Sequence, residues 1–445
     1  MRQVTFSPTV AAGAEERFQF RSVAPYIPRS SSQLPVSVST CKNHFEADVK
    51  PISIDPEWFR AVEQSLKRVD TWLQDHDYAA YDPFDGLSSF LRPLTLERKL
   101  LRQILLQGVK RTPFNLRPLV GIGRLRSTKG MGFLARGYLR WGILDRRRQK
   151  QAKTCLDWLQ EHTTRGFSGA CWGNAFDYQS RLFYLPAGQP TVVWSALIGH
   201  AFVDAFEAGM GRSYLATARS TSEFILRDLP RHRDDQGICI SYIPADTVPV
   251  HNANALAAGL LSRVYRHTGE PELRHQAEKA LAYTVGHQNP DGSWCYGVAM
   301  NLHWIDNWHT GYVLDSLLDH YQATGESRFM AAWRRGLAFY LENFFVSDGC
   351  PKYYPDSVYP VDIQCAAQSI ETLCRFADVQ PSCLPLAKDV ALWTICHMQD
   401  KAGYFYYQRH RMLLNRTPCL HWGQATMLSA LSLLLNRLSG EGQKA

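Results

Sequence analysis

The sequence predicts an all-α fold, an (α/α)6 toroid built from repeated helical hairpins, on three observations. A glycine followed by aromatic residues recurs at Gly237, Gly292, Gly349 and Gly403, at intervals of 55, 57 and 54 residues. Each of these turns lies between an amphipathic helical stretch and a more apolar one. The alternation typical of strands is scarce. A long fixed period indicates stacked copies of one supersecondary unit, none of which can bury its apolar face alone.

The two helices of each repeat differ in character. The first carries charge on one face, as an outer helix wetted on one side does. The predicted outer helices are residues 147–165, 214–228, 272–287, 328–344 and 384–398. The second is more apolar and richer in small residues, so we expect it to form an inner wall. The predicted inner helices are residues 192–207, 253–266, 310–322, 363–376 and 423–438.

A sixth hairpin completes the predicted ring. We assign its outer helix to residues 56–74 and its inner helix to residues 94–110, while the helical pattern at 128–144 has no assigned place. One toroid domain should therefore occupy residues 51–440. Residues 1–50 are rich in Ser, Pro and Val and lack a continuous apolar core, so we expect an N-terminal arm there and not a secretory signal.

Composition limits the function classes. Apolar residues make up 45% of the 445-residue chain, and no window approaches the roughly 18 apolar residues of a membrane-spanning helix. Eleven cysteines are spread singly, without a disulfide framework or a paired metal motif, which favours a reducing, cytoplasmic location. The net charge of +8 favours acidic partners, but no nucleic-acid-binding motif is visible. We expect no metal, no cofactor and no nucleic acid.

Polar and aromatic residues should gather where the inner helices begin, at the mouth of a central funnel. Carboxylates, amides and guanidinium groups beside aromatic faces suit a sugar ring, which stacks on Trp or Tyr and offers its hydroxyls to polar partners. The candidate binding residues are Trp172, Arg181, His251, Asn254, Trp294, Trp304, Lys352, Tyr353, Tyr406, Arg409, Trp422 and Gln424. The candidate catalytic residues are Asp177, Asp306, His309, Tyr354 and Asp362.

Several candidates also have a structural interpretation. Asp362 is suited to cap an inner helix, and Trp294 to wedge between neighbouring repeats. Asp306 and His309 stand three residues apart and share a face if that stretch is helical. They could form a catalytic carboxylate and base, or a buried structural hydrogen bond.

Two charged features bear on the ligand. Asp177 and Arg181 have the i,i+4 spacing of a structural ion pair, which competes with a catalytic role for the aspartate. Lys352 stands beside two tyrosines in a predicted loop, an environment that favours an acidic ligand over packing.

The run from Gln288 to Trp294, Gln-x-x-x-Gly-x-Trp, resembles the QW repeat of terpenoid-cyclase and prenyltransferase toroids, in which the two named side chains clamp adjacent helices. The resemblance implies a fold and says little about chemistry. The Asp-x-Asp-Asp acid motif of class II cyclases is absent. A prenyltransferase-like zinc set from Asp362, Cys365 and His421 lacks the usual Asp-x-Cys spacing.

Over residues 81–438 the sequence more closely resembles a poorly characterised bacterial family found with exopolysaccharide biosynthesis genes. The matching blocks are residues 81–87, 115–118, 171–173, 176–177, 304–312, 351–356 and 422–424. This resemblance implies an α/α toroid and a link to polysaccharide handling, without an established reaction. Six-hairpin glycosidases and toroid polysaccharide lyases share the architecture, which is an analogy of fold and not of function.

The first functional hypothesis is a carbohydrate-active enzyme that acts on an acidic poly- or oligosaccharide. Hydrolysis would need two carboxyl groups that flank one glycosidic bond, drawn from Asp177, Asp306 and Asp362. Lyase or epimerase chemistry would need a base, His309 or Tyr354, to remove the proton beside a uronate carboxylate.

In that second mechanism Arg181, Lys352 or Arg409 would neutralise the substrate carboxylate. Two alternatives stay open. One is a non-catalytic glycan-binding or scaffold toroid of a polysaccharide assembly system. The other is a terpenoid-cyclase- or prenyltransferase-like enzyme with an isoprenoid substrate.

Overall fold

A computed structural model of the chain describes residues 56–442, which all belong to the unit Lys42–Ala445. The predicted N-terminal arm, residues 1–50, lies outside the described residues. The helices are α1 (Pro56–Asp75), α2 (Lys99–Arg111), α3 (Thr128–Leu144), α4 (Gln149–Glu161), α5 (Val192–Glu207), α6 (Arg212–Arg227), α7 (His251–Thr268), α8 (Pro271–Gly286), α9 (Asn307–Thr324), α10 (Met330–Asn343), α11 (Ile363–Phe376), α12 (Cys383–Met398) and α13 (Ala425–Gly442).

Short antiparallel strands occupy the loops between these helices. They are β1 (Tyr178–Gln179), β2 (Tyr184–Leu185), β3 (Arg231–Asp234), β4 (Gly237–Ile240), β5 (Val361–Asp362), β6 (Gln408–Arg409) and β7 (Leu414–Asn415). β1 pairs with β2, β3 with β4, and β6 lies between β5 and β7. The described chain is therefore helical with small loop sheets, as predicted.

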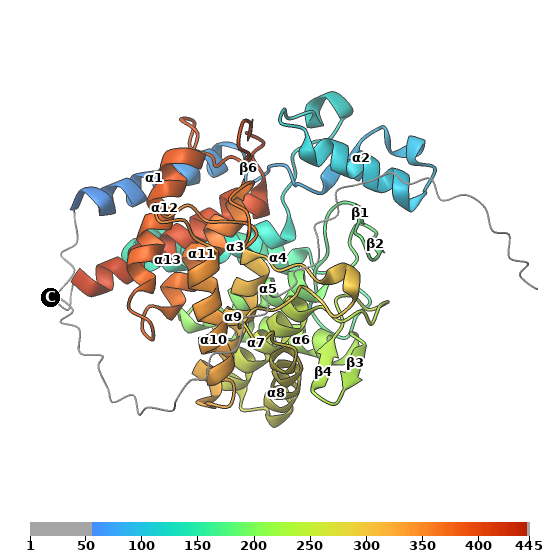
Figure 1. Cartoon of the computed structure of the whole chain (residues 1–445), viewed down its shortest axis with the longest axis vertical. Coiled ribbons are helices and arrows are strands. Elements are labelled where there is room, and N and C mark those ends of the chain that lie inside the picture. The colour runs from blue at the N-terminus through green and yellow to red at the C-terminus, as the bar shows by residue number, and fades with distance from the viewer. Residues whose placement is uncertain (1–55, 443–445) are drawn as a thin grey trace, which may run out of the picture. The chain divides into compact units, whose positions relative to one another are not determined.

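Six inner helices form a closed ring. In order these are α3, α5, α7, α9, α11 and α13; each packs against the next, and α13 packs against α3. An outer helix covers each inner one: α4, α6, α8, α10 and α12 cover α3 to α11, and α1 covers α13 (Figure 1). The predicted toroid and its closure are confirmed.

The predicted sixth hairpin is wrong in one helix. α2, which corresponds to the predicted inner helix at 94–110, packs against η1 (Asp85–Ser88), η2 (Arg92–Thr95) and β1, outside the ring. Its place is taken by α3, the stretch that had no assigned position. The reason is packing: α2 buries only Leu106 and Val109, whereas α3 is buried almost throughout.

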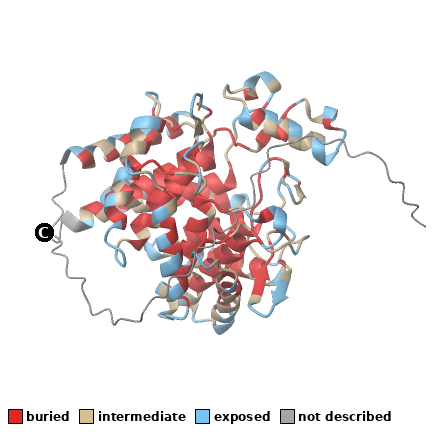
Figure 2. Cartoon of the chain, viewed as in Figure 1, coloured by how far each residue is buried: buried red, intermediate tan, exposed pale blue. Residues whose placement is uncertain are grey.

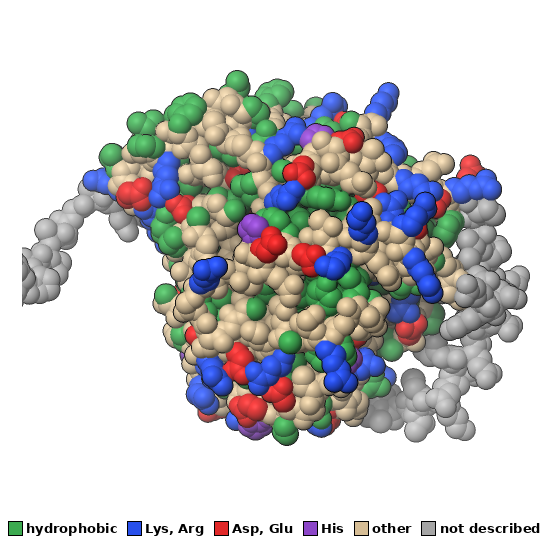
Figure 3. Space-filling view, turned by 180° about the vertical axis from the view of Figure 1, so that it is seen from behind, with side chains coloured by type: hydrophobic (Ala, Val, Ile, Leu, Met, Phe, Trp, Pro, Cys, Tyr) green, Lys and Arg blue, Asp and Glu red, His purple; other side chains and the backbone are tan. Residues whose placement is uncertain are grey.

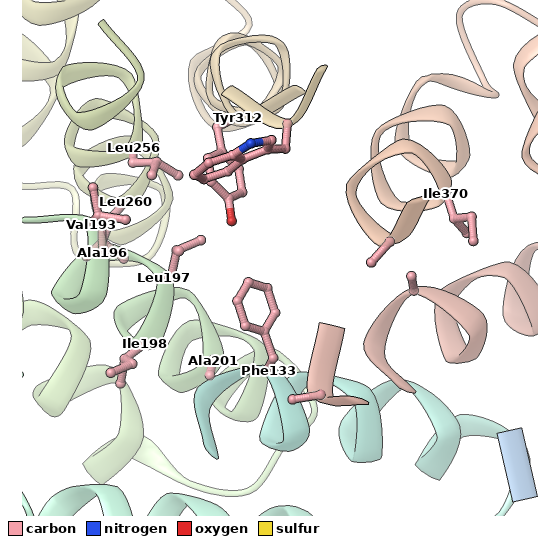
Figure 4. Packing of buried hydrophobic residues seen from close by; sticks show 14 of the residues in the cluster. Phe133, Val193, Ala196, Leu197, Ile198, Ala201, Leu256, Leu260, Tyr312 and Ile370 are labelled. Carbon is pink, nitrogen blue, oxygen red and sulfur yellow. The ribbon is translucent and has the colours of Figure 1, made fainter. Parts of the chain in front are cut away.

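Glycines let α3 approach its neighbours. A Cβ at Gly137 would stand 2.3 Å from a methyl carbon of Leu428 in α13, and one at Gly130 would stand 2.7 Å from Leu420. Side chains fill the space that is left around the axis. Phe133 of α3, Leu197 of α5 and Tyr312 of α9 converge there (Figure 4), and the inner helices are buried over most of their length (Figure 2).

The QW run clamps neighbouring repeats as its resemblance implies. Gln288 donates through Nε2 to the carbonyls of Gly292 (2.8 Å) and of Ala332 in α10 (2.9 Å), and Trp294 donates to the Thr284 carbonyl (2.9 Å). Gln399 makes the same two bonds, to Gly403 in its own turn (2.8 Å) and to Ser65 of α1 (3.1 Å). That second clamp joins the turn after α12, the last outer helix, to α1, the first outer helix.

Ion pairs close the end of the ring where the inner helices finish. They link Arg136 to Asp204 (2.8 Å), Arg140 to Glu371 (2.5 Å), Arg263 to Asp204 (2.7 Å) and Glu207 (2.5 Å), and Arg375 to Asp319 (2.5 Å). A cavity of about 190 Å³ lies among these side chains. Each of these four arginines already has a carboxylate partner. The network therefore holds the ends of the inner helices together, and the predicted site residues belong to the opposite end.

The seam between Gly403 and α1 gives a test of closure. Gly403 has φ +105°, and a Cβ there would stand 2.4 Å from the Arg68 carbonyl oxygen of α1; Gly325 has φ +70° and open space around it. Gly325→Ala should cost about 1 kcal/mol through its left-handed backbone alone. Gly403→Ala should cost about 3 kcal/mol, because it also pushes α1 away. Urea denaturation measures both; equal losses would mean that this turn does not hold the seam.

Candidate functional site

The first residues of the six inner helices gather at one end of the ring. Between one inner helix and the next, an outer helix returns the chain, so all six inner helices of the ring run in the same direction. The loops before them, which contain β1 to β7 and the glycine turns, therefore lie together at this end. Polar residues are common there because the exposed backbone N–H groups of a helix start need acceptors.

Trp422 connects four of these loops. It lies in a π-helical turn, Leu420–Gln424, that leads into α13. Its ring centre is 4.9 Å from that of Trp308 and 5.4 Å from that of Phe84, and its Nε1 donates to Asp362 (2.9 Å). The predicted site residues from the repeats of α9, α11 and α13 are thus brought together, and the loop before α2 joins them.

Asp306 and His309 form a hydrogen-bonded dyad. Asp306 caps α9 by accepting from the His309 backbone N–H (3.0 Å), and its buried carboxylate also accepts from Trp304 Nε1 (3.0 Å). His309 Nδ1 lies 2.6 Å from Asp306 Oδ2. With Nδ1 donating to the carboxylate, Nε2 is the basic nitrogen, and it has no hydrogen-bond partner within residues 56–442. Asp306 is the extended N-cap residue of α9 and not part of the helix, so the two side chains meet through the cap and not on a shared helix face. The geometry suits a base.

Half-buried aromatic side chains surround this dyad. Tyr296 stacks on Trp304 (4.4 Å between ring centres) and lies 4.6 Å from His309. Further half-buried rings nearby are Phe84, Tyr178, Tyr242, Tyr353 and Tyr354. Burial raises the pKa of Tyr354 to about 12, and the Asp306 carboxylate adds to this rise, so the hydroxyl is protonated at neutral pH. We call Tyr296, Trp304, Tyr353 and Tyr354 the aromatic rim.

Cationic side chains stand at the rim. Arg181 is exposed and lies over Trp304, 5.0 Å from its ring centre. Lys352 is half-buried and donates to the Pro355 carbonyl in its own loop, and burial lowers its pKa. Arg409 is half-buried in β6, which pairs with β5. Of the three cations, Arg181 contacts the aromatic rim directly, through Trp304.

Asp362 is buried and fully engaged. It accepts from the Gln364 backbone N–H (2.8 Å), from Gln408 Nε2 (2.6 Å) and from Trp422 Nε1 (2.9 Å). The predicted helix-capping role is therefore present. Burial raises the pKa of this carboxyl to about 6, partly opposed by these hydrogen bonds and by Lys110.

A second Asp–His pair was missed by the sequence reasoning. His421 Nδ1 lies 2.7 Å from Asp82 Oδ2, and both residues are buried. Burial lowers the pKa of His421, and the neighbouring carboxylate opposes this only in part. For Asp82, burial would raise the pKa, but His421, the Phe84 N–H and Arg117 together lower it. Asp82 lies far from α13 in sequence, so local spacing could not reveal this pair. The only sequence signal near it was the family resemblance at residues 81–87 and 422–424.

Lys129, also missed, is a buried cation at the start of α3. Its Nζ lies 5.1 Å from the ring centre of Trp194 and 5.9 Å from that of Trp422, and it has no hydrogen bond or ion pair in the described chain. Burial lowers its pKa to about 8, and Asp82 limits the decrease. It therefore carries a positive charge at neutral pH, placed between aromatic faces.

Several predicted binding residues are structural and do not reach the mouth. Trp172 is fully buried, donates to the Leu159 carbonyl (2.9 Å) and stacks on Phe202. Trp294 is the wedge of the QW clamp.

Three predicted polar residues are also structural. Asn254 accepts from the Ile240 N–H (2.9 Å) and donates to the Ala280 carbonyl (2.7 Å), and Gln424 bonds to both backbone groups of Phe405 (2.7 and 2.8 Å). His251 packs against Tyr283 and His287 beside α8. Asn254, in the first turn of α7, and Gln424, in the π-helical turn before α13, thereby anchor the loops that precede them.

The predicted ion pair between Asp177 and Arg181 is wrong. Asp177 instead accepts from Tyr184 (2.7 Å) and the Ala187 N–H (2.7 Å) and pairs with Arg92. The residues are not on a helix: β1 and β2 form a hairpin, which turns Arg181 toward Trp304. Tyr406 is held by Asp400 (2.8 Å) and contacts Arg416, away from the dyad.

Comparison with known proteins agrees with this architecture. A family model for pectic acid lyase matches residues 297–365. A GH76 α-mannanase from Bacteroides thetaiotaomicron is 15% identical, with a TM-score of 0.54 over 71% of this chain and 87% of that one. A cellobiose 2-epimerase from Spirochaeta thermophila is 13% identical, with a TM-score of 0.56 over 71% and 86%. A family 88 glycosyl hydrolase from Bacteroides vulgatus is 10% identical, with a TM-score of 0.54 over 85% and 99%.

At these identities the likeness shows the fold: the chain has the six-hairpin α/α toroid of glycosidase-like enzymes. No curated protein matches the chain. Of the helices between residues 56 and 442, none combines the length and apolarity needed to cross a bilayer.

The buried Asp362 carboxyl predicts a pH-dependent stability. Its pKa is about 6 in the fold and 3.8 ordinarily, so the folded protein keeps a proton that the unfolded chain releases. Its contribution is complete below about pH 4 and is lost as the pH rises through 6, about 3 kcal/mol in all. Between pH 4 and pH 7, wild type should lose that much more unfolding free energy than Asp362→Asn. The control Asp378→Asn, at an exposed ion pair, should follow wild type.

Proposed function

We propose that this protein is a carbohydrate-active enzyme that removes a proton from an acidic glycan, and that it is a polysaccharide lyase. The observation that carries this proposal is the dyad of Asp306 and His309, with Nε2 of the histidine unpartnered among aromatic side chains. A neutral imidazole held by a carboxylate in one tautomer is a competent general base near neutral pH.

Paired-carboxylate hydrolysis has less support. It needs two carboxyl groups on either side of one glycosidic bond. Asp177 is bound by Arg92, Tyr184 and a backbone N–H, Asp362 by three donors, and Asp306 by Trp304 and His309. None of these three sequence-derived candidates has a free carboxylate at the rim.

An acidic substrate is supported by the cations of the site. Arg181 and Lys352 stand at the aromatic rim, and Lys129 is a buried cation without an acceptor. An unpaired buried charge costs free energy, and an anionic ligand group close to it would lower that cost. The aromatic rim supplies faces on which sugar rings stack.

The reaction that suits these residues is a β-elimination. His309 Nε2 takes the proton from the ring carbon beside the uronate carboxylate. The released electron pair forms a double bond to the adjacent ring carbon, and the glycosidic oxygen on that carbon leaves with its bonding pair. The negative charge that develops on the carboxylate in the transition state is stabilised by Arg181 or Lys352.

The leaving oxygen needs a proton, and Tyr354 is the proposed donor. Its hydroxyl is protonated at neutral pH, because its pKa is about 12. After the reaction His309 releases the abstracted proton to solvent, and Tyr354 takes one back from solvent. The resting enzyme is thereby restored, and no oxidant or co-reactant is needed. Asp306 keeps His309 oriented and stabilises the imidazolium that forms.

The comparisons support the class of reaction. The pectic acid lyase model spans residues 297–365, the segment that holds Asp306, His309, Lys352, Tyr354 and Asp362. Cellobiose 2-epimerases share the fold, and epimerisation is the second candidate function: it would use the same proton abstraction and return the proton to the opposite face. A role in polysaccharide biosynthesis or modification in the cytoplasm is part of the proposal, and the free cysteines of the described chain agree with a reducing compartment.

Substitution of the base tests the mechanism. Wild type should release unsaturated uronate products from polygalacturonate, seen as ultraviolet absorbance, and should not act on neutral mannan. His309→Gln should lower the rate about 10²- to 10⁴-fold while the circular dichroism is unchanged, because the general base is lost. His303→Gln, at an exposed histidine of the loop before α9, is the matched control and should keep wild-type activity.

Three results would contradict the lyase proposal. New reducing ends without unsaturation, unaffected by His309→Gln, would indicate hydrolysis. Incorporation of solvent deuterium into an uncleaved sugar would indicate epimerisation. Glycan binding with background turnover in wild type and variant alike would indicate a binding scaffold.

A further inference from the structure

Residues 88–126 form a lobe outside the ring, which we call the α2 lobe. It contains η2, α2 and η3 (Arg117–Val120) and rests on the β1–β2 hairpin: Arg92 donates to Tyr184 (3.0 Å) and Gln103 to the Ser180 carbonyl (3.0 Å). The lobe has nine Lys or Arg residues and a single acidic residue, Glu97. This excess equals the net charge of +8 of the entire chain. Arg92 and Arg117 pair with Asp177 and Asp85, but the proposed reaction uses none of these nine side chains directly.

Two copies of an Arg-Pro-Leu turn display leucines on this lobe. In η2, Arg92 turns inward to Asp177, and Leu94 is 72% exposed. In η3, Arg117 is buried against Asp85 (2.8 Å), and Leu119 is 75% exposed. In each turn the arginine is anchored inward, and the leucine two residues later points into solvent.

The outward face of α2 continues this apolar surface. Leu100, Ile104, Gly108 and Arg111 are exposed at intervals of three or four residues, so they form one stripe, while Leu106 and Val109 face inward. Phe90 and Leu96 are also exposed beside it. The space-filling view from behind shows hydrophobic side chains gathered at the upper left, over this lobe, with Lys and Arg next to them (Figure 3).

Two residues beside this surface have an unfavourable backbone conformation. Leu96 and Glu97, between η2 and α2, both have left-handed backbone with φ of +47° and +54°. Such a conformation is unfavourable for any residue with a Cβ, because the Cβ approaches the following carbonyl oxygen, and it is often retained at functional sites. Here it ends η2 and leaves Leu96 exposed.

We propose that the α2 lobe docks this protein on an anionic membrane surface. Arg98, Lys99 and Arg124 are exposed next to the apolar residues and have no ion pair within the described chain. Leucine and phenylalanine tips flanked by unpaired cations match the two layers of a bilayer interface, the acyl boundary and the anionic headgroups.

A lipid surface fits this lobe better than a protein partner does. The exposed apolar residues stand on separate tips, two turns and one helix face. A deformable apolar layer accepts separate tips, whereas a protein partner needs a complementary surface. The same hairpin that supports the lobe carries Arg181 to the aromatic rim, so docking would bring the mouth of the ring near the membrane.

Vesicle sedimentation with the full-length protein tests the proposal. Wild type should bind vesicles of phosphatidylcholine with phosphatidylglycerol, bind pure phosphatidylcholine far more weakly, and lose binding as salt rises. Leu94→Ser/Leu119→Ser/Ile104→Ser should weaken binding at least ~10-fold through lost apolar insertion. Arg98→Gln/Lys99→Gln/Arg124→Gln should also weaken it ~10-fold or more and flatten the salt dependence.

The matched control is Ile143→Ser/Met412→Ser, which removes two equally exposed apolar residues elsewhere and should bind like wild type. All of these positions are at the surface, so the variants should keep the wild-type circular dichroism. Equal affinity of wild type for neutral and anionic vesicles, or no binding to either, would overturn the proposal. A dimer in light scattering that the leucine variant dissociates would assign the lobe to a second copy instead.

Discussion

The packing of α3 against α13 is the contact on which the rest of the structure depends. Only this contact makes a closed ring of an array whose ends are nearly three hundred residues apart, α3 beginning at Thr128 and α13 at Ala425. It is possible because Gly130 and Gly137 leave room for Leu420 and Leu428. The Gln399 clamp to α1 repeats the closure in the outer layer. Without closure, each repeat would expose the apolar inner wall that its neighbour now covers.

Closure also assembles the site. It places His421 beside Asp82 and Trp422 beside Lys129, although these residues come from opposite ends of the described chain. The same step brings Trp308 and Asp362 into contact with Trp422. A site formed this way is rigid, because each side chain is held by helices that the ring fixes from both sides.

Capping and chemistry share the same atoms at the mouth. Asp306 accepts the His309 N–H in the first turn of α9 and orients the His309 ring, so the residue that caps the helix also sets the tautomer of the proposed base. Asp362 likewise caps α11 and also orients Trp422 by accepting a hydrogen bond from its Nε1. For Asp306, the structural role and the proposed catalytic role are therefore compatible. The helix start needs a buried acceptor, and a buried carboxylate beside a histidine can serve both needs.

The sequence by itself determined the period, the alternation of amphipathic and apolar helices and the QW clamp. These properties are local: they depend on spacing along one or two helices, and neighbouring repeats repeat them. It also indicated that Asp306 and His309 could meet, and they do so because an N-cap carboxylate reaches the residue three positions later.

The tertiary structure showed which helix completes the ring: α3, which is more apolar and richer in glycine than α2, finds neighbours on both sides, whereas α2 packs outside. It also decided the partners of Asp177, Asp82 and Lys129. Those depend on which loops meet after closure, and pairings across hundreds of residues leave no periodic trace in the chain. For the same reason, Trp172 and Trp422 look equivalent in sequence, yet one wedges between helices and the other stands at the centre of the site.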